Sequence, residues 1–71
     1  MDQKKIGKFI SEKRKELKLT QAQLAEKLGV TDKTVSRWEN GNYMPDLSLL
    51  QQLSKELNVS INELLSGEKV S

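Results

Sequence analysis

The most restrictive feature of this sequence is a very short connection between two short segments with helical periodicity. Residues 21–28 and 32–40 each place apolar residues at the three- and four-residue spacings of an α-helix. Only Gly29, Val30 and Thr31 separate the two segments. Gly29 suits the left-handed position that follows a helix, and Thr31 suits the N-cap of the next one. The sequence therefore predicts two short helices joined by a tight turn.

Helical periodicity continues on both sides of this pair, over residues 3–17, 46–57 and 61–66. Capping-box patterns precede two of the five segments, at residues 20–23 and 60–63. Aromatic residues make up only 4% of the chain and β-branched residues are scattered, which disfavours strands. We therefore predict an all-α fold, a compact five-helix bundle. Its apolar stripes consist of Ile6, Phe9, Ile10 and Leu17; Ala22, Leu24, Ala25 and Leu28; Val35 and Trp38; and Leu47, Leu50, Leu53 and Leu57.

The length of 71 residues suits one compact domain. We assign residues 1–66 to this domain and residues 67–71 to a flexible tail or the start of a linker. The N-terminal segment lacks the apolar run of a secretory signal, and no stretch approaches the ~20 apolar residues that a membrane span needs. These features favour a cytoplasmic protein that does not bind membranes, and the lack of cysteine agrees with this location.

The composition argues against an enzyme or a metalloprotein. The sequence contains neither cysteine nor histidine. Disulfides and thiolate metal sites are therefore excluded, and the commonest general base and metal ligand is missing. The acidic residues show no spacing that resembles a calcium-binding loop. We expect no catalytic residues, no metal, no cofactor and no small-molecule ligand.

The basic residues are concentrated at the N-terminal end of the chain. Residues 1–18 contain seven basic and three acidic residues, whereas the remainder contains five basic and seven acidic residues. This asymmetry is typical of proteins that bind a polyanion. A solvated, charged helix face is an equally good explanation, so charge alone leaves both interpretations open.

The segment 32–40 carries the strongest functional pattern. At about 100° per residue, Val35 and Trp38 point toward the core. The opposite face holds Lys33, Ser36, Arg37 and Asn40, with Asp32 and Thr34 toward its edges. Such cations, hydroxyls and amides contact base edges and phosphates, and an α-helix fits the major groove of DNA. We therefore predict that this face reads DNA; an ordinary solvated face is the alternative, which the preceding tight turn makes less favourable.

Two residues at helix starts are candidates for contacts with phosphate. Gln21 opens the segment 21–28, where free backbone amides and the helix dipole favour an anion. The alternative is that Gln21 is simply a good helix former at that position. Thr31 suits an N-cap and a phosphate contact together.

Three further residues are better explained by structure than by binding. Arg14 lies beside the apolar face of the first segment, and Glu39 flanks the inward face of the third. We interpret them as a structural ion pair and do not assign Arg14 to DNA. Trp38, at helical spacing from Val35, is interpreted as a core residue and not as part of a ligand site.

Over about residues 6–66, the chain resembles the Cro/cI repressor family, also called the XRE family. The resemblance rests on Thr-Gln-x-x-Leu-Ala from Thr20, Gly-Val-Thr from Gly29, Val-Ser-x-Trp-Glu-x-Gly from Val35, and Pro-Asp from Pro45. It implies a lambda-repressor-like fold in which helices 2 and 3 form a helix-turn-helix. It also implies binding to operator DNA, usually as a two-fold homodimer on a palindromic site.

The resemblance further implies individual roles by position. Bases are contacted by Asp32, Lys33 and Arg37, the DNA backbone by Gln21, Thr31 and Asn40, and a structural ion pair forms between Arg14 and Glu39. Two positions depart from the family pattern. Lys13 stands where an apolar residue is common, and Asp32 is an acid where many relatives carry Gln or Ser. Asp32 either accepts from cytosine N4 or only caps the helix and repels phosphates.

We therefore expect a sequence-specific regulator of transcription that binds double-stranded DNA, with repression favoured. The alternative is a protein-interaction or antitoxin-type module of the same fold, which would account for the modest net charge of +2. Ile61, Leu64 and Leu65 are the candidate dimer interface, unless these residues close the core instead.

Overall fold

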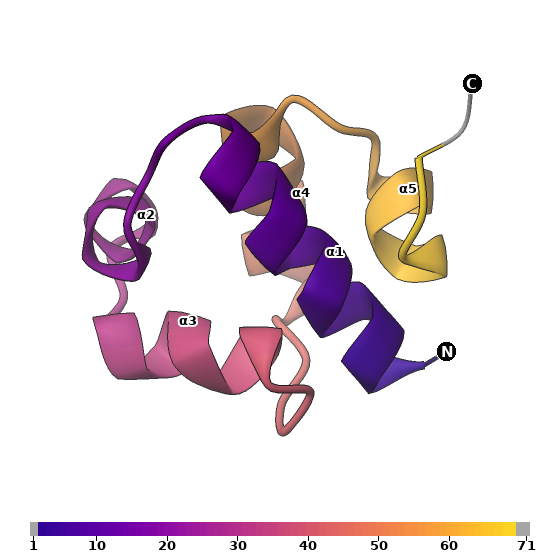
Figure 1. Cartoon of the computed structure of the whole chain (residues 1–71), viewed down its shortest axis with the longest axis horizontal. Coiled ribbons are helices and arrows are strands. Elements are labelled where there is room, and N and C mark those ends of the chain that lie inside the picture. Colours follow the sequence, from indigo (N-terminus) through magenta and orange to yellow (C-terminus); the bar gives the residue numbers. More distant parts are fainter. Residues whose placement is uncertain (1, 70–71) are drawn as a thin grey trace.

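The computed structural model describes residues 2–69, and within this range it contains five α-helices and no strand. α1 spans Gln3–Glu16, α2 Gln21–Leu28, α3 Asp32–Glu39, α4 Leu47–Leu57 and α5 Ile61–Ser66. In Figure 1, α1 runs diagonally across the front, α3 lies below it, α2 and α5 lie on opposite sides, and α4 lies behind. The all-α, five-helix bundle expected from the sequence is confirmed.

Each helix begins after a polar residue whose side chain accepts a hydrogen bond from a free backbone amide of the first turn. These N-caps are Asp2, Thr20, Thr31, Asp46 and Ser60. The turn between α2 and α3 uses Gly29 at a φ of 71°, a left-handed conformation that glycine adopts without steric cost. The local sequence therefore determines where α2 stops and where α3 starts.

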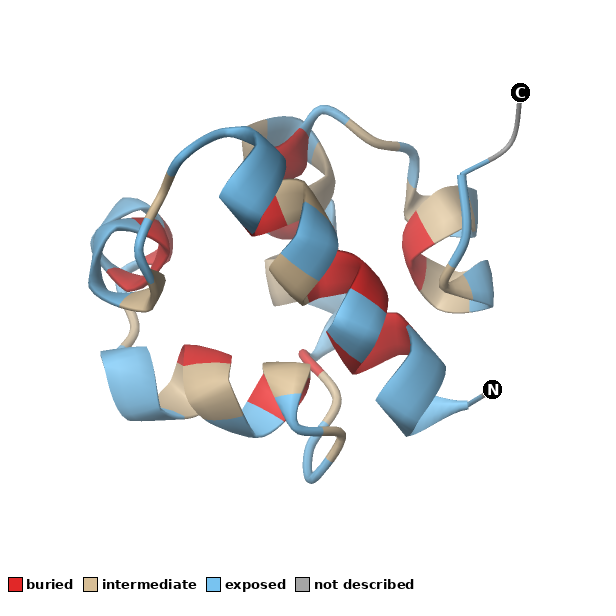
Figure 2. Cartoon of the chain, in the orientation of Figure 1, coloured by how far each residue is buried: buried red, intermediate tan, exposed pale blue. Residues whose placement is uncertain are grey.

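The core lies where α1 meets α3, α4 and α5, and where α2 meets α3 and α4. Figure 2 shows the buried residues on the inward faces of the helices. The side chains that are almost completely inaccessible to solvent are Ile6, Ile10, Leu24, Val35, Leu53 and Leu64. Trp38 is also buried, so its interpretation as a core residue is confirmed.

Three apolar residues that the helical spacing placed in the core are exposed instead. Leu17 caps the C-terminus of α1 and is 42% exposed, because the chain turns away at Lys18, where φ is 60°. Leu47 is 69% exposed, because as the first residue of α4 it lies beyond the neighbours that cover Leu50. Ala22 is exposed near the start of α2. All three predictions were wrong at or near helix ends, where the apolar spacing of the sequence continues but other helices no longer cover the side chains.

Lys13 is a charged residue on the apolar face of α1, and its side chain packs over an aromatic ring. Only 13% of its side chain is exposed, and its ammonium group lies 5.4 Å from the centre of the Phe9 ring and 3.3 Å from Glu16. The methylenes therefore cover apolar surface while the charge has both an aromatic and a carboxylate neighbour.

The last described residues are held against the bundle by a hydrogen bond and an ion pair. The backbone amide of Gly67 donates to the carbonyl of Glu63 at 2.8 Å, and Lys5 pairs with Glu68 at 3.2 Å. The predicted tail at 67–71 therefore begins with residues that contact α5 and α1. Its last two positions lie outside the described residues.

Gly7 allows the backbone of α1 to approach the end of α3. A Cβ atom at this position would overlap the carbonyl oxygen of Trp38 and would lie 2.7 Å from that of Glu39. Both neighbours are backbone atoms of a packed helix, so neither has a flexible side chain that could move aside. Residue 7 must therefore remain glycine if α1 and α3 are to keep this distance.

We expect Gly7→Ala to lower the free energy of unfolding by about 1–3 kcal/mol, the usual cost of overpacking. In an exposed helix the same change would stabilise the protein by about 1 kcal/mol, so the sign identifies the contact. Urea unfolding followed by circular dichroism measures the change. Lys8→Ala, at the next and exposed position of α1, is the control. A stable Gly7→Ala protein would contradict the close approach.

Candidate nucleic-acid interface

α3 presents one face to the core and the other to solvent. Val35 is 0% exposed and Trp38 is 3% exposed, whereas Lys33 and Arg37 are both exposed. Neither cation forms an ion pair within residues 2–69. Their ammonium and guanidinium groups are therefore available to a ligand outside the chain.

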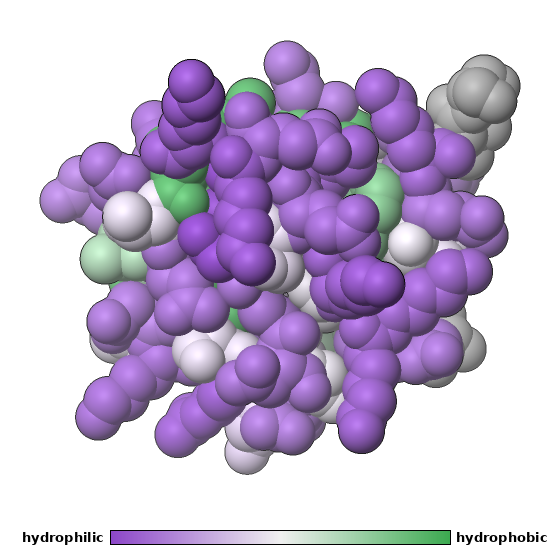
Figure 3. All heavy atoms as spheres, in the orientation of Figure 1, coloured by the Kyte–Doolittle hydropathy of each residue, from purple (hydrophilic) through white to green (hydrophobic). Residues whose placement is uncertain are grey.

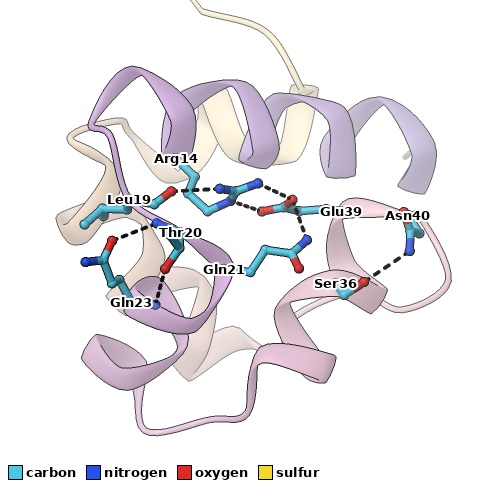
Figure 4. Close-up of polar contacts among 8 residues, drawn as sticks. All are labelled: Arg14, Leu19, Thr20, Gln21, Gln23, Ser36, Glu39 and Asn40. Atoms are coloured by element: carbon cyan, nitrogen blue, oxygen red, sulfur yellow. Dashed lines mark hydrogen bonds and ion pairs between the residues drawn. The ribbon is translucent and has the colours of Figure 1, made fainter.

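The hydroxyl and amide residues of the same face are held by hydrogen bonds within α3. Asn40 caps the C-terminus of the helix and donates from Nδ2 to Oγ of Ser36 at 3.3 Å. Ser36 is half-buried, and Asn40 is exposed. Figure 4 shows this pair at the C-terminal end of α3.

The N-terminus of α3 is closed by two threonines. Thr31 Oγ1 accepts from the backbone amide of Thr34 at 3.3 Å, and the two hydroxyl oxygens lie 3.0 Å apart. Asp32 is exposed in the first turn and is not the N-cap, because Thr31 occupies that position. A carboxylate in the first turn is stabilised by the positive end of the helix dipole.

The side chain of Gln21 extends from the start of α2 toward Glu39 of α3, as Figure 4 shows. It is the first residue of α2, and its Nε2 donates to Oε1 of Glu39 at 3.0 Å. The side-chain N–H group is thus engaged inside the protein, an arrangement that the sequence analysis did not anticipate. The hydrogen bond fixes the start of α2 against the C-terminal end of α3.

The centre of this network is a bidentate ion pair between α1 and α3. Arg14 Nε donates to Glu39 Oε2 at 2.6 Å, and Nη2 donates to Oε1 at 3.0 Å. The Arg14 and Glu39 side chains are only 10% and 6% exposed. Arg14 Nη1 also donates to the carbonyl oxygen of Leu19 at 2.7 Å. One side chain therefore joins α1, the α1–α2 connection and α3 (Figure 4).

The pKa of Glu39 reflects competing effects in this network. Burial raises it, but hydrogen bonds from Arg14 and Gln21, together with the positive charge of Arg14, outweigh burial and hold the pKa below its ordinary value. The hydrogen bond from Arg14 to Glu39 raises the pKa of the guanidinium, and desolvation only partly offsets it. Both groups are therefore charged at neutral pH.

Tyr43, which the sequence analysis did not single out, adjoins the exposed face of α3. It follows α3 in the connection to α4 and is 60% exposed. The Arg37 guanidinium carbon lies 5.7 Å from the centre of its ring. Both residues line a hollow of about 250 Å³ between α3 and α4, together with Trp38, Met44, Leu49 and others. The periodicity of α3 could not reveal Tyr43, because the chain reverses direction between the two residues.

The candidate dimer interface on α5 needs a correction. Leu64 is 0% exposed and belongs to the core, so it is not available to a second copy of the chain. Ile61 and Leu65 are half-buried, and Leu65 also packs against the core. Helical spacing grouped these residues on one helix but did not distinguish a core-facing position from a free one.

The face in Figure 3 is mostly hydrophilic, with small, scattered hydrophobic patches, and polar side chains project where α3 lies. Within residues 2–69, no group of histidine, cysteine or acidic side chains is placed to hold a metal ion. No helix in this range is long and apolar enough to cross a membrane.

Comparison with known proteins agrees with this geometry. A family model described as helix-turn-helix matches residues 10–64, which contain α2, α3 and the turn between them. The chain belongs to the XRE family of helix-turn-helix transcriptional regulators. The fold class is likewise that of the lambda-repressor-like regulators.

Two curated relatives illustrate the range of lengths in this XRE family. The HTH-type transcriptional activator BcrR of Enterococcus faecalis is 48% identical over 52 residues, which are 73% of this chain and 26% of that protein. The ImmF control region 10 kDa protein of Bacillus phage phi105 is 38% identical over 68 residues, which are 96% of this chain and 76% of that protein. The chain therefore spans about a quarter of one relative and about three quarters of the other.

Two similar solved structures differ in how much of the solved chain this fold occupies. The P22 c2 repressor, crystallised in complex with a synthetic operator, matches with a TM-score of 0.85 and 38% identity, over 89% of this chain and 96% of that one. Hydroxypropylphosphonic acid epoxidase from S. wedmorenis matches with a TM-score of 0.81 and 31% identity, over 89% of this chain and 34% of that one. The epoxidase thus shares the fold in about a third of its length.

Proposed function

We propose that this XRE-family chain binds a specific sequence of double-stranded DNA in the cytoplasm, inserts α3 into the major groove and regulates transcription, in the first instance as a repressor. The observation that carries the proposal is that Lys33 and Arg37 are both exposed on one face of α3, with no carboxylate paired to either within residues 2–69. The N-terminus of α2 is hydrogen-bonded to the C-terminal end of α3 through Gln21 and Glu39, and in a helix-turn-helix the first helix crosses the DNA backbone. The similar P22 c2 repressor was crystallised in complex with a synthetic operator, which supports DNA as the ligand.

The proposed contacts divide into two groups. Those with base edges involve Lys33, Arg37, Asp32, Ser36 and Thr34, and those with phosphates involve Gln21, Thr31 and Asn40. Arg37 and Lys33 are suited to guanine, which presents two acceptors in the major groove. Gln21 contributes to a phosphate site through the N-terminus of α2, where backbone amides point outward, while its side chain stays on Glu39. Arg14 and Glu39 support α3 from inside and do not touch DNA.

We further propose that two copies of the chain bind a palindromic operator. Helix-turn-helix dimers place their recognition helices in successive major grooves, about 34–36 Å apart along the duplex. A single small domain reads only one half-site, so a second copy adds the affinity and sequence length that a genomic site demands. We propose that the chain acts by binding and has no catalytic activity.

Selection of bound sequences from a random DNA pool tests this function. We expect enrichment of a two-fold symmetric motif, and we expect the logarithm of the binding constant to fall linearly with the logarithm of salt concentration. Enrichment of a single, asymmetric half-site would contradict the dimer but not DNA binding. If no sequence were enriched while the chain captured a protein partner tightly, the interaction or antitoxin-type module would replace the proposal.

A further inference from the structure

Arg37 and Tyr43 are held together by the backbone as well as by their side chains. The amides of Asn42 and Tyr43 both point to the carbonyl oxygen of Arg37, at 2.9 and 3.4 Å. The chain turns back at Gly41, where φ is 77°. The position of the tyrosine relative to Arg37 is therefore fixed by the end of α3 and not only by rotation of an exposed side chain.

The ring of Tyr43 lies within reach of the positive charge of Arg37. The distance of 5.7 Å between the guanidinium carbon and the ring centre falls inside the ~6 Å over which a cation is attracted to an aromatic face. No carboxylate pairs with this guanidinium within residues 2–69. Among the described residues, the Tyr43 ring is the aromatic group that lies over this guanidinium.

We propose that Tyr43 is a specificity-determining residue that positions the guanidinium of Arg37 for contact with a base in the major groove. A guanidinium that packs against an aromatic face keeps its N–H groups directed along its edges, which is the geometry that guanine accepts. Within residues 2–69, Lys33 is exposed and has neither an aromatic ring over its charge nor a carboxylate in an ion pair with it. The inference rests on the proposed function, because it assigns a role within DNA recognition.

The energetic basis is a smaller loss of side-chain freedom on binding. An arginine that is already confined before DNA arrives loses less rotamer entropy when it contacts a base. Arg37 and Tyr43 line the same hollow, together with the buried Trp38. We therefore expect the benefit to appear in discrimination between operators and not in general attraction to DNA.

The test combines Tyr43→Leu, which removes the aromatic face, with Tyr43→Phe, which keeps the face and removes only the hydroxyl. On the selected operator, we expect Tyr43→Leu to weaken binding about two- to fivefold, the fold-change that corresponds to about 0.5–1 kcal/mol for an exposed cation–π contact. The salt dependence should stay unchanged, because no charge is lost. Tyr43→Phe should bind like the original protein.

Double-mutant cycles distinguish positioning from a direct contact. The cycle of Tyr43→Leu with Arg37→Ala should show coupling, because the ring has no effect once the guanidinium is gone. The matched cycle of Tyr43→Leu with Lys33→Ala should be additive. Equal behaviour in the two cycles would overturn the inference, as would tighter binding by Tyr43→Leu, which would mean that the ring draws Arg37 away from DNA.

A measurement on the free protein separates this inference from the proposed function. ¹⁵N relaxation of the Arg37 Nε–H group should show a side chain that is more mobile in Tyr43→Leu than in Tyr43→Phe. Equal mobility in the two variants would overturn the positioning role while leaving DNA binding intact. A chain with an ordered Arg37 that selects no DNA sequence would instead overturn the proposed function, and with it the assignment of Tyr43 to specificity.

Discussion

Replacing Arg14 with methionine is expected to lower the free energy of unfolding by about 3–5 kcal/mol, because the Glu39 carboxylate would remain buried without its cation. The Glu39 side chain is only 6% exposed, so water cannot replace the guanidinium effectively. The carbonyl oxygen of Leu19 would lose its donor as well. Chemical denaturation followed by circular dichroism measures the effect, and for a domain of this size the loss approaches the whole stability.

The paired replacement separates the cost of an orphaned charge from the net value of the ion pair. We expect Arg14→Met combined with Glu39→Leu to recover much of the lost stability, because well-packed apolar residues often substitute for a buried ion pair. Lys15→Met, at an exposed position of α1, is the control for charge and helix propensity. A double variant as unstable as the single one would show that packing, and not the unpaired carboxylate, determines the loss.

The same carboxylate makes stability depend on pH. Because the folded pKa of Glu39 is lowered, its contribution is fully present above the unfolded pKa of about 4.3 and is lost as the pH falls through the folded value. Stability should therefore fall in this acid range, and Glu39→Gln should fall less steeply over the same range. Parallel curves for the two proteins would contradict the lowered pKa.

The second large effect is expected on DNA recognition. Arg37→Ala should weaken binding to the selected operator by about 1–3 kcal/mol and reduce discrimination at one base pair of each half-site. The guanidinium is exposed and has no carboxylate partner within residues 2–69, so its removal should leave the fold intact. Fluorescence anisotropy with the operator and with single-base variants measures affinity and discrimination together.

Two variants make this prediction specific. Arg37→Lys keeps the charge but loses bidentate geometry, so it should retain the salt dependence and lose discrimination. Lys55→Ala removes an exposed cation near the end of α4 and should leave operator binding unchanged. If Arg37→Ala lost the same affinity for every sequence, Arg37 would contact phosphate instead of a base.

The positions of the helices could be predicted from the sequence because residues at the helix ends determine where each helix begins and stops. Thr20, Thr31 and Ser60 cap helices through their own side chains, and Gly29 ends α2 in a conformation that glycine adopts easily. The partnership of Arg14 and Glu39 also followed from their places on two helix faces.

The remaining features depend on tertiary distances that periodicity does not contain. Leu64 and Leu47 both follow the helical spacing of the apolar residues in their own helices. Leu64 is nevertheless fully buried, whereas Leu47 is exposed. The partner of the Gln21 amide depends on how α2 meets the end of α3. Tyr43 meets Arg37 only because the chain turns back after α3. The sequence therefore predicted which residues face outward on α3 better than it predicted what surrounds them.

The attachment of Arg14 to both Leu19 and Glu39 has a consequence for protein engineering. A peptide that contained only α2 and α3 would lack the Arg14 guanidinium, which belongs to α1. Such a fragment would keep every candidate base-reading side chain but would leave the buried Glu39 carboxylate of α3 without its cation. Grafting α2 and α3 onto another scaffold therefore requires α1 to be grafted with them.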